Sequence, residues 1–257
     1  MALPPTTRTF IGARHAVITP ESHVKTSFPG WSGTRTIVTI SPHVGAGFVQ
    51  YIAEMTAGGH AAPPPVGVER FVFVLEGHVT FRAGHDDVHE LHEEAFAFAP
   101  SGTFTGMDAV TTSRVFVLDR RAITAPHGTE PAFVVVARLD EIEKLPFLGD
   151  PRARLQSLLP DLPGFDIAMN VFTFEPGACL PLVESHYMEH GVIFLQGGGI
   201  YRLEDQWYPV QREDQMWMGP FCPQWFAAVG NEPARYLYYK NGNRNPLLDL
   251  TIAPGDA

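Results

Sequence analysis

The sequence repeats itself at a separation of about 120 residues, and this repeat limits the possible folds more than any other feature. Chance similarity between short apolar runs is common in β-rich chains, but here the order is kept across four blocks, which favours an internal duplication. A duplicated chain is expected to fold as two similar units. The paired blocks are 47–58 with 166–177, 69–77 with 189–197, 94–100 with 214–220, and 114–119 with 235–240.

Each block has the character of a β-strand, because it is short, rich in Val, Phe, Tyr and Ile, and bounded by Gly, Pro, Asp or Asn. The 24 Gly and 23 Pro are spread along the chain, as expected of many short strands joined by tight turns. Between the repeats, residues 140–145 and 152–159 are the best helical candidates, separated by Pro146 and Pro151. The sequence therefore predicts an all-β fold of two similar barrels or sandwiches with a short, partly helical connector.

Composition excludes several classes of protein. The 18 Lys and Arg against 28 Asp and Glu give a net charge of −10, so no basic surface for nucleic acid is expected. No apolar run approaches the roughly 18 residues needed to cross a membrane, and the first residues do not resemble a secretory signal. The two cysteines are too few for a disulfide framework or a cysteine-rich zinc module. We expect a cytoplasmic protein.

A cluster of metal-binding residue types occurs in the second repeat, as Glu184, His186 and His190, with Gln224 following 34 residues after His190. Residues i and i+2 of a strand point the same way, so Glu184 and His186 can face one interior. A turn can bring His190 to the same place, and Gln224 follows the Gly- and Pro-rich corner 219–223. Two imidazoles, a carboxylate and an amide without thiolate suit Mn(II), Fe(II) or Ni(II) better than a structural zinc site.

Two other interpretations of this cluster are open. Residues 186–190 read H-x-x-E-H, an inverted zinc-peptidase motif that requires a helix. Pro181 before it and Gly191 with a β-branched run after it leave no room for such a helix. The cluster could also be polar core residues that bind no metal, but two histidines and a carboxylate so close together in a predicted barrel interior disfavour this interpretation.

The residues around the cluster resemble the two motifs of the cupin superfamily. Residues 177–197 are similar to G-x5-H-x-H-x3/4-E-x6-G, with Glu184 at the first histidine position and His190 at the glutamate position. Residues 219–224 match P-x-G-x2-H loosely, with Gln224 at the histidine position. From about residue 15 to about residue 245 the chain looks like two tandem cupin (jelly-roll-like) barrels. The implied domains are an N-terminal cupin without metal ligands (1–125), a connector (126–165), and a C-terminal cupin with the metal site (166–257).

The Glu-x-His-x3-His…Gln variation, with Tyr236 and Lys240 downstream, is similar to the (S)-ureidoglycine aminohydrolase family. The flanking residues at 189–191, 198–203 and 239–244 share this similarity. The resemblance implies hydrolysis of (S)-ureidoglycine to (S)-ureidoglycolate and ammonia, a step of allantoin and purine catabolism. It also implies Mn2+, with Fe2+, Ni2+ or Co2+ as alternatives, and a small ureido substrate that carries a carboxylate. The implied ligands are Glu184, His186, His190 and Gln224.

Strand alternation places Tyr236, Tyr238 and Lys240 on one face of the last block and Leu237 and Tyr239 on the other. If the first face is interior, it carries two phenols and an ammonium group towards the metal. A lysine inside a barrel needs an anion, which a substrate carboxylate could supply, although a lysine at a strand end could instead reach solvent.

The candidate catalytic residues are Lys240, Tyr236 and Tyr201, which would orient the substrate carboxylate or move a proton to the leaving amine. Tyr201 is included because the resemblance implies a substrate-contacting tyrosine there. The three tryptophans Trp207, Trp217 and Trp225 are expected in the wall and core rather than in catalysis.

The first repeat lacks the ligand pattern, because Arg70 stands at the glutamate position and Thr105 at the last ligand position. Arginine cannot bind a metal there, so this half is expected to be metal-free and to supply scaffold and subunit contacts in a homo-oligomer. Its histidines His85, His89 and His92 are interpreted as a solvated hairpin.

Two further functions remain open. One is another metal-dependent cupin enzyme, such as a dioxygenase, which would consume oxygen with Fe(II), or a sugar-acid isomerase. The other is a non-catalytic cupin that binds a small molecule without turnover.

Overall fold

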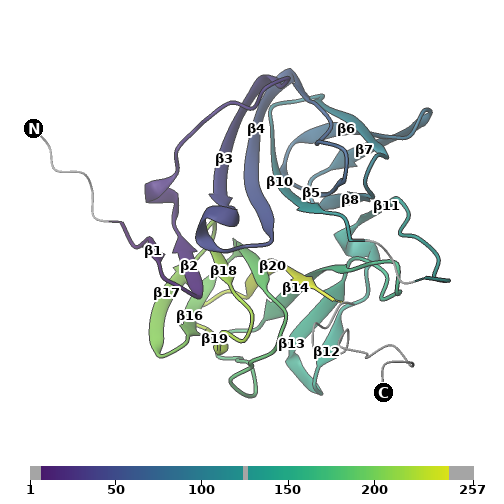
Figure 1. Cartoon of the computed structure of the whole chain (residues 1–257). Helices are drawn as coiled ribbons and strands as arrows, with labels where there is room; N and C mark the ends of the chain where they lie inside the picture. The colour runs from purple at the N-terminus through teal and green to yellow at the C-terminus, as the bar shows by residue number, and fades with distance from the viewer. Residues whose placement is uncertain (1–6, 124–126, 243–257) are drawn as a thin grey trace, which may run out of the picture.

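Nearly all of the chain forms β-strands in the computed structural model, which describes residues 7–123 and 127–242 (Figure 1). These residues contain no α-helix; three 3-10 turns occur at Pro20–Ser22, Pro42–Val44 and Leu139–Glu141. None of the described segments is a helix of the length and apolar character that a membrane crossing requires. The predicted all-β class is confirmed.

The first half forms one strongly curled sheet. The 14-residue strand β4 pairs with β10 along its first part and with β9 at its end, so the sheet bends round into a nearly closed barrel. The order is β11 (Val135–Arg138), β8 (Ala95–Ala99), β5 (Val68–Glu76), β10 (Ser113–Arg121), β4 (Phe48–Ala61), β9 (Phe104–Ala109), β6 (His78–Ala83) and β7 (Asp87–His92), with β3 (Ser32–Ile40) also paired to β4.

The second half forms two sheets that enclose a second core. The larger sheet has the order β1 (Phe10–Ile11), β2 (His15–Ile18), β18 (Gln215–Met218), β15 (His190–Gln196), β20 (Ala234–Asn241), β14 (Ile167–Phe174), β13 (Asp150–Ser157) and β12 (Leu145–Phe147). The smaller sheet has the order β17 (Gln206–Gln211), β16 (Gly198–Leu203) and β19 (Gln224–Ala228).

The internal repeat of the sequence is visible in the sheet topology. The four blocks of the first copy lie in β4, β5, β8 and β10, and those of the second lie in β14, β15, β18 and β20. The order β8-β5-β10-β4 in one sheet matches β18-β15-β20-β14 in the other. At equivalent edges, β11 extends the first sheet at β8, and β2 extends the second at β18. The N-terminal strand β2 therefore belongs to the sheet of the second half.

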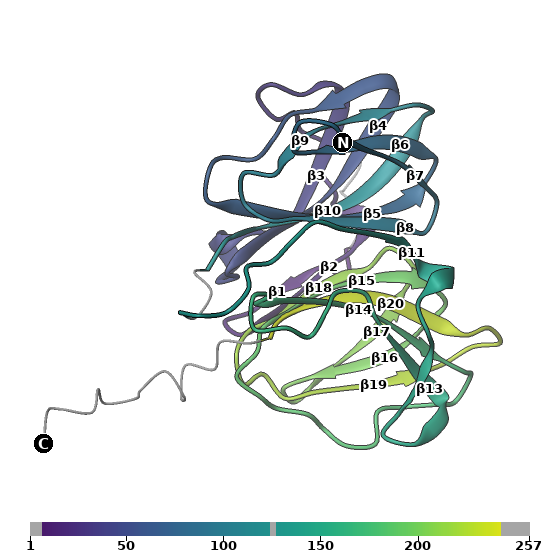
Figure 2. The ribbon, with the colours of Figure 1, turned by 90° about the vertical axis from the view of Figure 1, so that its right-hand side faces the viewer.

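The two halves stack through the faces of these matching strands (Figure 2). Apolar side chains from both halves form one shared cluster, in which the rings of Phe48 and Tyr239 lie 4.7 Å apart. Buried polar bonds also cross the contact: the Gln50 amide nitrogen donates to the Val192 carbonyl at 3.1 Å. The sheet that carries the candidate site is thus supported from behind by the first half.

The prediction of helix in the connector is wrong. Residues 140–145 contain part of the 3-10 turn Leu139–Glu141 and the first residue of strand β12, and residues 152–157 lie in strand β13, which pairs with β14. An eight-residue segment is too short to be a stable helix by itself, so pairing with β14 determines its structure. Ala153 and Leu155 both face the core of the second half, with the period of two that a strand requires.

Candidate active site

A cavity of about 200 Å³ opens between the larger sheet of the second half and strands β16 and β19. All seven candidate site residues line it, so the structure brings the whole predicted set together. The lining is Glu184, His186, His190, Tyr201, Gln224, Tyr236 and Lys240, with Phe147, Phe172, Leu180, Met188, Val192, Met218 and Tyr238.

The imidazole rings of His186 and His190 lie next to each other in the lining of this cavity. His190 is the first residue of β15, and its Nδ1 donates to the Tyr239 carbonyl at 3.1 Å, which leaves a lone pair on its Nε2. That Nε2 lies 3.2 Å from Nε2 of His186. Burial lowers the pKa of His190 to about 3, and burial with the charge of Lys240 lowers the pKa of His186. Both imidazoles are therefore neutral at pH 7, the form that binds metals.

Glu184 and Gln224 are placed by one isolated bridge between their backbones, in which each amide donates to the other's carbonyl at 2.8 and 2.9 Å. The Gln224 side-chain amide approaches Nε2 of His186 at 3.4 Å and accepts the Tyr201 hydroxyl at 3.1 Å. Burial raises the pKa of Glu184, while Lys240 opposes this rise.

The residues of this cavity fit a divalent metal by the chemistry of their donors. His186 and His190 are neutral and present facing nitrogens. Gln224 lies next to them with its amide nitrogen towards His186 and its oxygen towards Tyr201, so a half-turn of the amide would present the oxygen, and this set of donors suits Mn(II)-type ions. Among the described residues, no group of three His, Cys, Asp or Glu side chains is arranged to hold a metal. The fit therefore rests on the two histidines and the glutamine, with the Glu184 carboxylate in the same cavity.

The expected alternation along β20 is confirmed. Tyr236, Tyr238 and Lys240 line the cavity, whereas Leu237 and Tyr239 lie in the apolar cluster between the halves. Because the tyrosines are buried, the pKa values of Tyr236 and Tyr238 are raised, and both hydroxyls stay protonated.

Tyr201, on β16, lies next to Tyr236 of β20 in the lining of the cavity, with the two ring centres 6.3 Å apart. Burial raises the pKa of Tyr201 as well. Lys240 is half-buried, and its ammonium forms no hydrogen bond or ion pair with any residue in the described part of the chain.

Glu189, the glutamate of the H-x-x-E-H pattern, lies outside this cavity. Its carboxylate accepts the Gly47 amide at 3.0 Å and the Trp217 indole N–H at 3.2 Å, and burial raises its pKa. Because β15 begins at His190, the two histidines share no helix. The zinc-peptidase arrangement is therefore excluded. Glu189 instead connects the loop before β15 to the first half through its hydrogen bond with the Gly47 amide.

The corresponding region of the first half is occupied by an ion pair. Arg70 is 3% exposed and donates from Nε and Nη2 to the two Asp119 oxygens at 2.7 and 2.8 Å, and to the Tyr51 hydroxyl at 3.0 Å. Of the hairpin histidines, His85 and His92 are exposed and His89 pairs with Asp87, which confirms the solvated β6–β7 hairpin.

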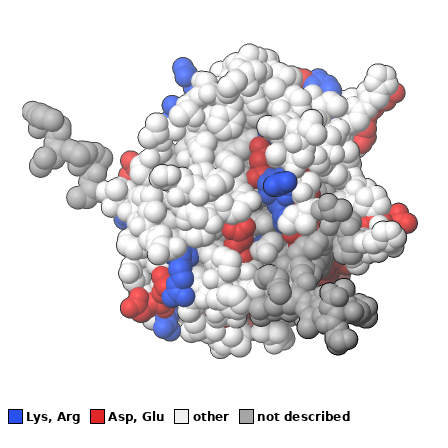
Figure 3. Space-filling view, in the orientation of Figure 1, with Lys and Arg blue, Asp and Glu red and all other residues white. Residues whose placement is uncertain are grey.

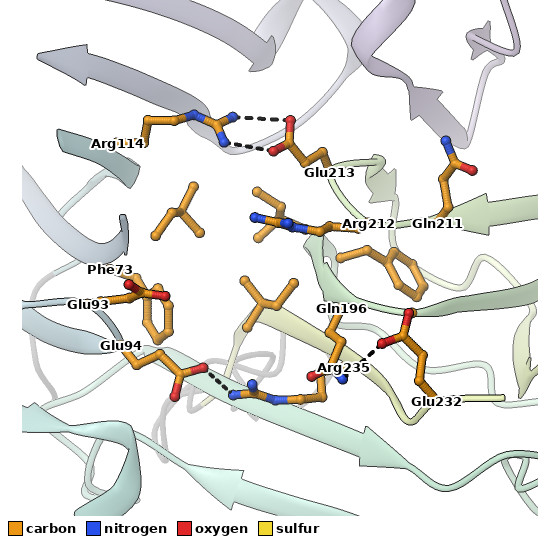
Figure 4. A pocket seen from close by; sticks show the side chains of 15 residues that line it. Phe73, Glu93, Glu94, Arg114, Gln196, Gln211, Arg212, Glu213, Glu232 and Arg235 are labelled. Carbon is orange, nitrogen blue, oxygen red and sulfur yellow. Dashed lines mark hydrogen bonds and ion pairs between the residues drawn. The ribbon is translucent and has the colours of Figure 1, made fainter. Parts of the chain in front are cut away.

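A larger cavity of about 580 Å³ lies between the halves and contains none of the predicted site residues. Its arginines are paired, Arg114 with Glu213 and Arg235 with Glu94 (Figure 4), and Arg212 with Glu76. On the molecular surface drawn in Figure 3, Lys and Arg also lie close to Asp and Glu. The described lining of this cavity therefore contains neither a histidine nor an unpaired cation, unlike that of the smaller one.

Sequence reasoning missed the apolar part of the lining. Phe172 could have been found, because its position on β14 has the same parity as the interior residue Phe174. Phe147 and Leu180 come from segments whose approach to the cavity depends on the fold, and no local pattern identifies them.

The fold and this cavity define a cupin-type protein. Solved structures with similar folds include a putative glyoxylate-induced protein from Pseudomonas aeruginosa, with a TM-score of 0.83, 29% identity and 94% of each chain covered. Oxalate decarboxylase from Bacillus subtilis matches with a TM-score of 0.72 over 94% of this chain and 81% of that one, at 10% identity, a likeness of fold alone. A search against models of protein families finds none that matches.

Curated relatives narrow the class to one family. A probable (S)-ureidoglycine aminohydrolase from Oryza sativa subsp. japonica is 41% identical over 96% of this chain and 79% of its own. The (S)-ureidoglycine aminohydrolase of Escherichia coli (strain K12) is 31% identical over 90% of this chain and 89% of its own. The chain belongs to the (S)-ureidoglycine aminohydrolase family.

Proposed function

We propose that this protein hydrolyses (S)-ureidoglycine to (S)-ureidoglycolate and ammonia at the cavity of its second half, with Mn(II) as cofactor, and so serves allantoin and purine catabolism. The observation that carries this proposal is the convergence of His186, His190 and Gln224 with Lys240 in one cavity. Fe(II), Co(II) and Ni(II) have overlapping ligand preferences and are the alternative cofactors.

The residues divide into a metal-holding group and a substrate-holding group. Glu184, His186, His190 and Gln224 would hold the metal, which supplies Lewis-acid polarisation and fixes one face of the reacting carbon. Lys240 supplies the positive charge for the substrate carboxylate, because its ammonium is half-buried and forms no hydrogen bond or ion pair with a described residue; the Glu184 carboxylate of the same cavity acts on it only through space.

Tyr201 and Tyr236 would handle protons at the leaving amine. The two rings lie 6.3 Å apart in the lining of one cavity, and the Tyr201 hydroxyl donates to the Gln224 amide oxygen at 3.1 Å, so both phenols can donate to a group bound there. Their raised pKa values make them donors rather than bases at neutral pH.

Replacing Lys240 with methionine is expected to raise the KM for ureidoglycine by about 10- to 100-fold, because a charge-assisted contact to the substrate carboxylate is lost. Lys240→Arg, which keeps the charge, should lose less. Steady-state ammonia release gives KM and kcat separately; an unchanged KM in Lys240→Met would remove this residue from substrate binding.

Replacing Gln224 with alanine is expected to weaken Mn(II) binding at least about tenfold, since one neutral oxygen ligand is lost. Equilibrium dialysis of Mn(II) measures the effect. The matched control is Gln196→Ala, whose amide binds Glu232 outside the cavity and whose loss should leave the affinity unchanged. Equal affinities in both variants would place Gln224 outside the metal site.

The activity itself is tested by incubating purified protein with freshly generated (S)-ureidoglycine. Ammonia should appear in a 1:1 ratio to ureidoglycolate of a single configuration, because a fixed cavity presents one face of the carbon to water. Ammonia at the uncatalysed rate, or racemic ureidoglycolate, would reject the assignment. Oxygen consumption with Fe(II) would instead indicate a dioxygenase.

The matching strand order of the two halves also supports two tandem cupin barrels, with residues 1–125 and 166–257 carrying the barrels and 126–165 connecting them. The first boundary adjoins residues 124–126, which lie outside the described part of the chain. Strands β1, β2, β12 and β13 pair with the second sheet although they come from the first segment and the connector. We further expect a cytoplasmic homo-oligomer without nucleic-acid or membrane partners.

A further inference from the structure

A second cavity, of about 320 Å³, adjoins the candidate active site. Met188 and Lys240 line both cavities, so they form the boundary between them. We call this second space the antechamber. It is lined by Ser157, Leu159, Pro160, Asp161, Phe165, Ile167, Ala168, Asn170, Met188, Lys240 and Gly242.

Strand register places Lys240 between the two spaces. On one side Lys240 is paired with His190 of β15, and on the other with Ala168 of β14. Two residues further along β14, Asn170 is paired with Tyr238 of β20. Asn170 has the same parity as Ala168 and Phe172 on β14 and therefore shares their face. Asn170 and Lys240 thus lie diagonally across one strand pair, within reach of a common small ligand.

The side chain of Asn170 has an unused hydrogen-bond donor. The residue is 4% exposed, and its Nδ2 is buried without a hydrogen-bond partner among the described residues. A buried donor left unsatisfied is unfavourable, and native structures rarely keep one without a reason. Lys240, on the wall of the same antechamber, forms no hydrogen bond or ion pair with any residue in 7–123 or 127–242.

We propose that Asn170 and Lys240 together hold the carboxylate of a small ureido acid, so that the antechamber is the carboxylate subsite of the active site. This inference rests on the proposed function and adds a specificity-determining residue to it. An amide N–H and an ammonium are both donors, so the pair selects an anionic acceptor over a neutral one. Leu159, Phe165 and Ile167 provide apolar walls, and Asp161, the one carboxylate among the described residues of the lining, is exposed to solvent.

The test uses two unreactive probes and calorimetric titration of the Mn(II)-loaded protein. Hydantoate (N-carbamoylglycine) carries the ureido group and the carboxylate but no amine to release, whereas methylurea lacks the carboxylate. Asn170→Leu, of similar size, should weaken hydantoate binding about tenfold and leave methylurea binding unchanged. Asn170→Asp should weaken hydantoate binding further, because a carboxylate then faces a carboxylate.

Thr173→Val is the matched control, since Thr173 lies on the same strand, its hydroxyl is also buried without a partner among the described residues, and it lines neither cavity. Its hydantoate affinity should equal that of the wild type. Equal hydantoate affinity in wild type and both Asn170 variants, or no hydantoate binding by the wild type at millimolar concentration, would overturn the inference.

The proposed function and the proposed carboxylate subsite can be rejected independently of each other. If the wild type releases ammonia from ureidoglycine while Asn170→Leu keeps the wild-type KM and hydantoate affinity, the subsite is wrong and the function stands. If hydantoate binding depends on Asn170 but no ammonia is released, the subsite stands and the function is wrong.

Discussion

Replacing His190 with alanine is expected to lower the kcat for ammonia release at least about a thousandfold and to remove the bound metal. His190 is the more deeply buried of the two candidate histidine ligands, 5% exposed, and its tautomer is fixed by the 3.1 Å bond to the Tyr239 carbonyl. Mutation of a residue that only hydrogen-bonds a metal ligand typically lowers metal affinity or activity 10- to 100-fold. Loss of a buried ligand itself should lower both by more. Metal content and kcat, measured on the same preparation, check both parts.

The control for this variant is His89→Ala. His89 lies on the solvated β6–β7 hairpin, where it pairs with Asp87, so activity and metal content should both stay at wild-type levels. A His190→Ala protein that keeps its metal and most of its activity would show that the reaction takes place elsewhere.

Replacing Arg120 with methionine is expected to lower the free energy of unfolding by about 3–5 kcal/mol. Its side chain is 4% exposed, and the guanidinium donates to Asp166 Oδ2 at 2.7 Å, to the Asp166 carbonyl at 2.6 Å and to the Tyr239 hydroxyl at 3.0 Å. It also pairs with Glu69 at 3.2 Å. Without the guanidinium, two carboxylates lose their buried counter-charge at the contact between the halves.

Urea unfolding of the metal-loaded protein measures this effect, with Arg138→Met as the control. Arg138 is exposed and pairs with Asp140 on the surface, where an ion pair contributes little, so its midpoint should not move. If Arg120→Met unfolds at the same urea concentration as the control, the buried network does not hold the two halves together.

Strands and site residues could be predicted from the sequence where the signal is local. Apolar runs bounded by turns located the repeated strands, and the period of two placed Tyr236, Tyr238 and Lys240 on one face. The close spacing of Glu184, His186 and His190 also predicted that they converge. They do so because a short loop carries the first two directly into strand β15, which begins at His190.

Features that depend on distant pairing could not be predicted. The four-residue strand His15–Ile18 pairs with Gln215–Met218, and nothing in its own sequence indicates a partner about 200 residues away. Residues 152–157 form a strand although their composition favours a helix, because their backbone pairs with the edge of β14. The unsatisfied donor of Asn170 is defined only by the groups that surround it in three dimensions.

The central claim is that the cavity of the second half uses a metal to release ammonia from (S)-ureidoglycine. Its most direct test is the rate of ammonia release by one preparation before chelator treatment, after it, and after Mn(II) is added back. We expect the activity to disappear with the metal and to return in proportion to the Mn(II) bound, up to one ion per chain. Undiminished activity in the metal-free protein would contradict the account.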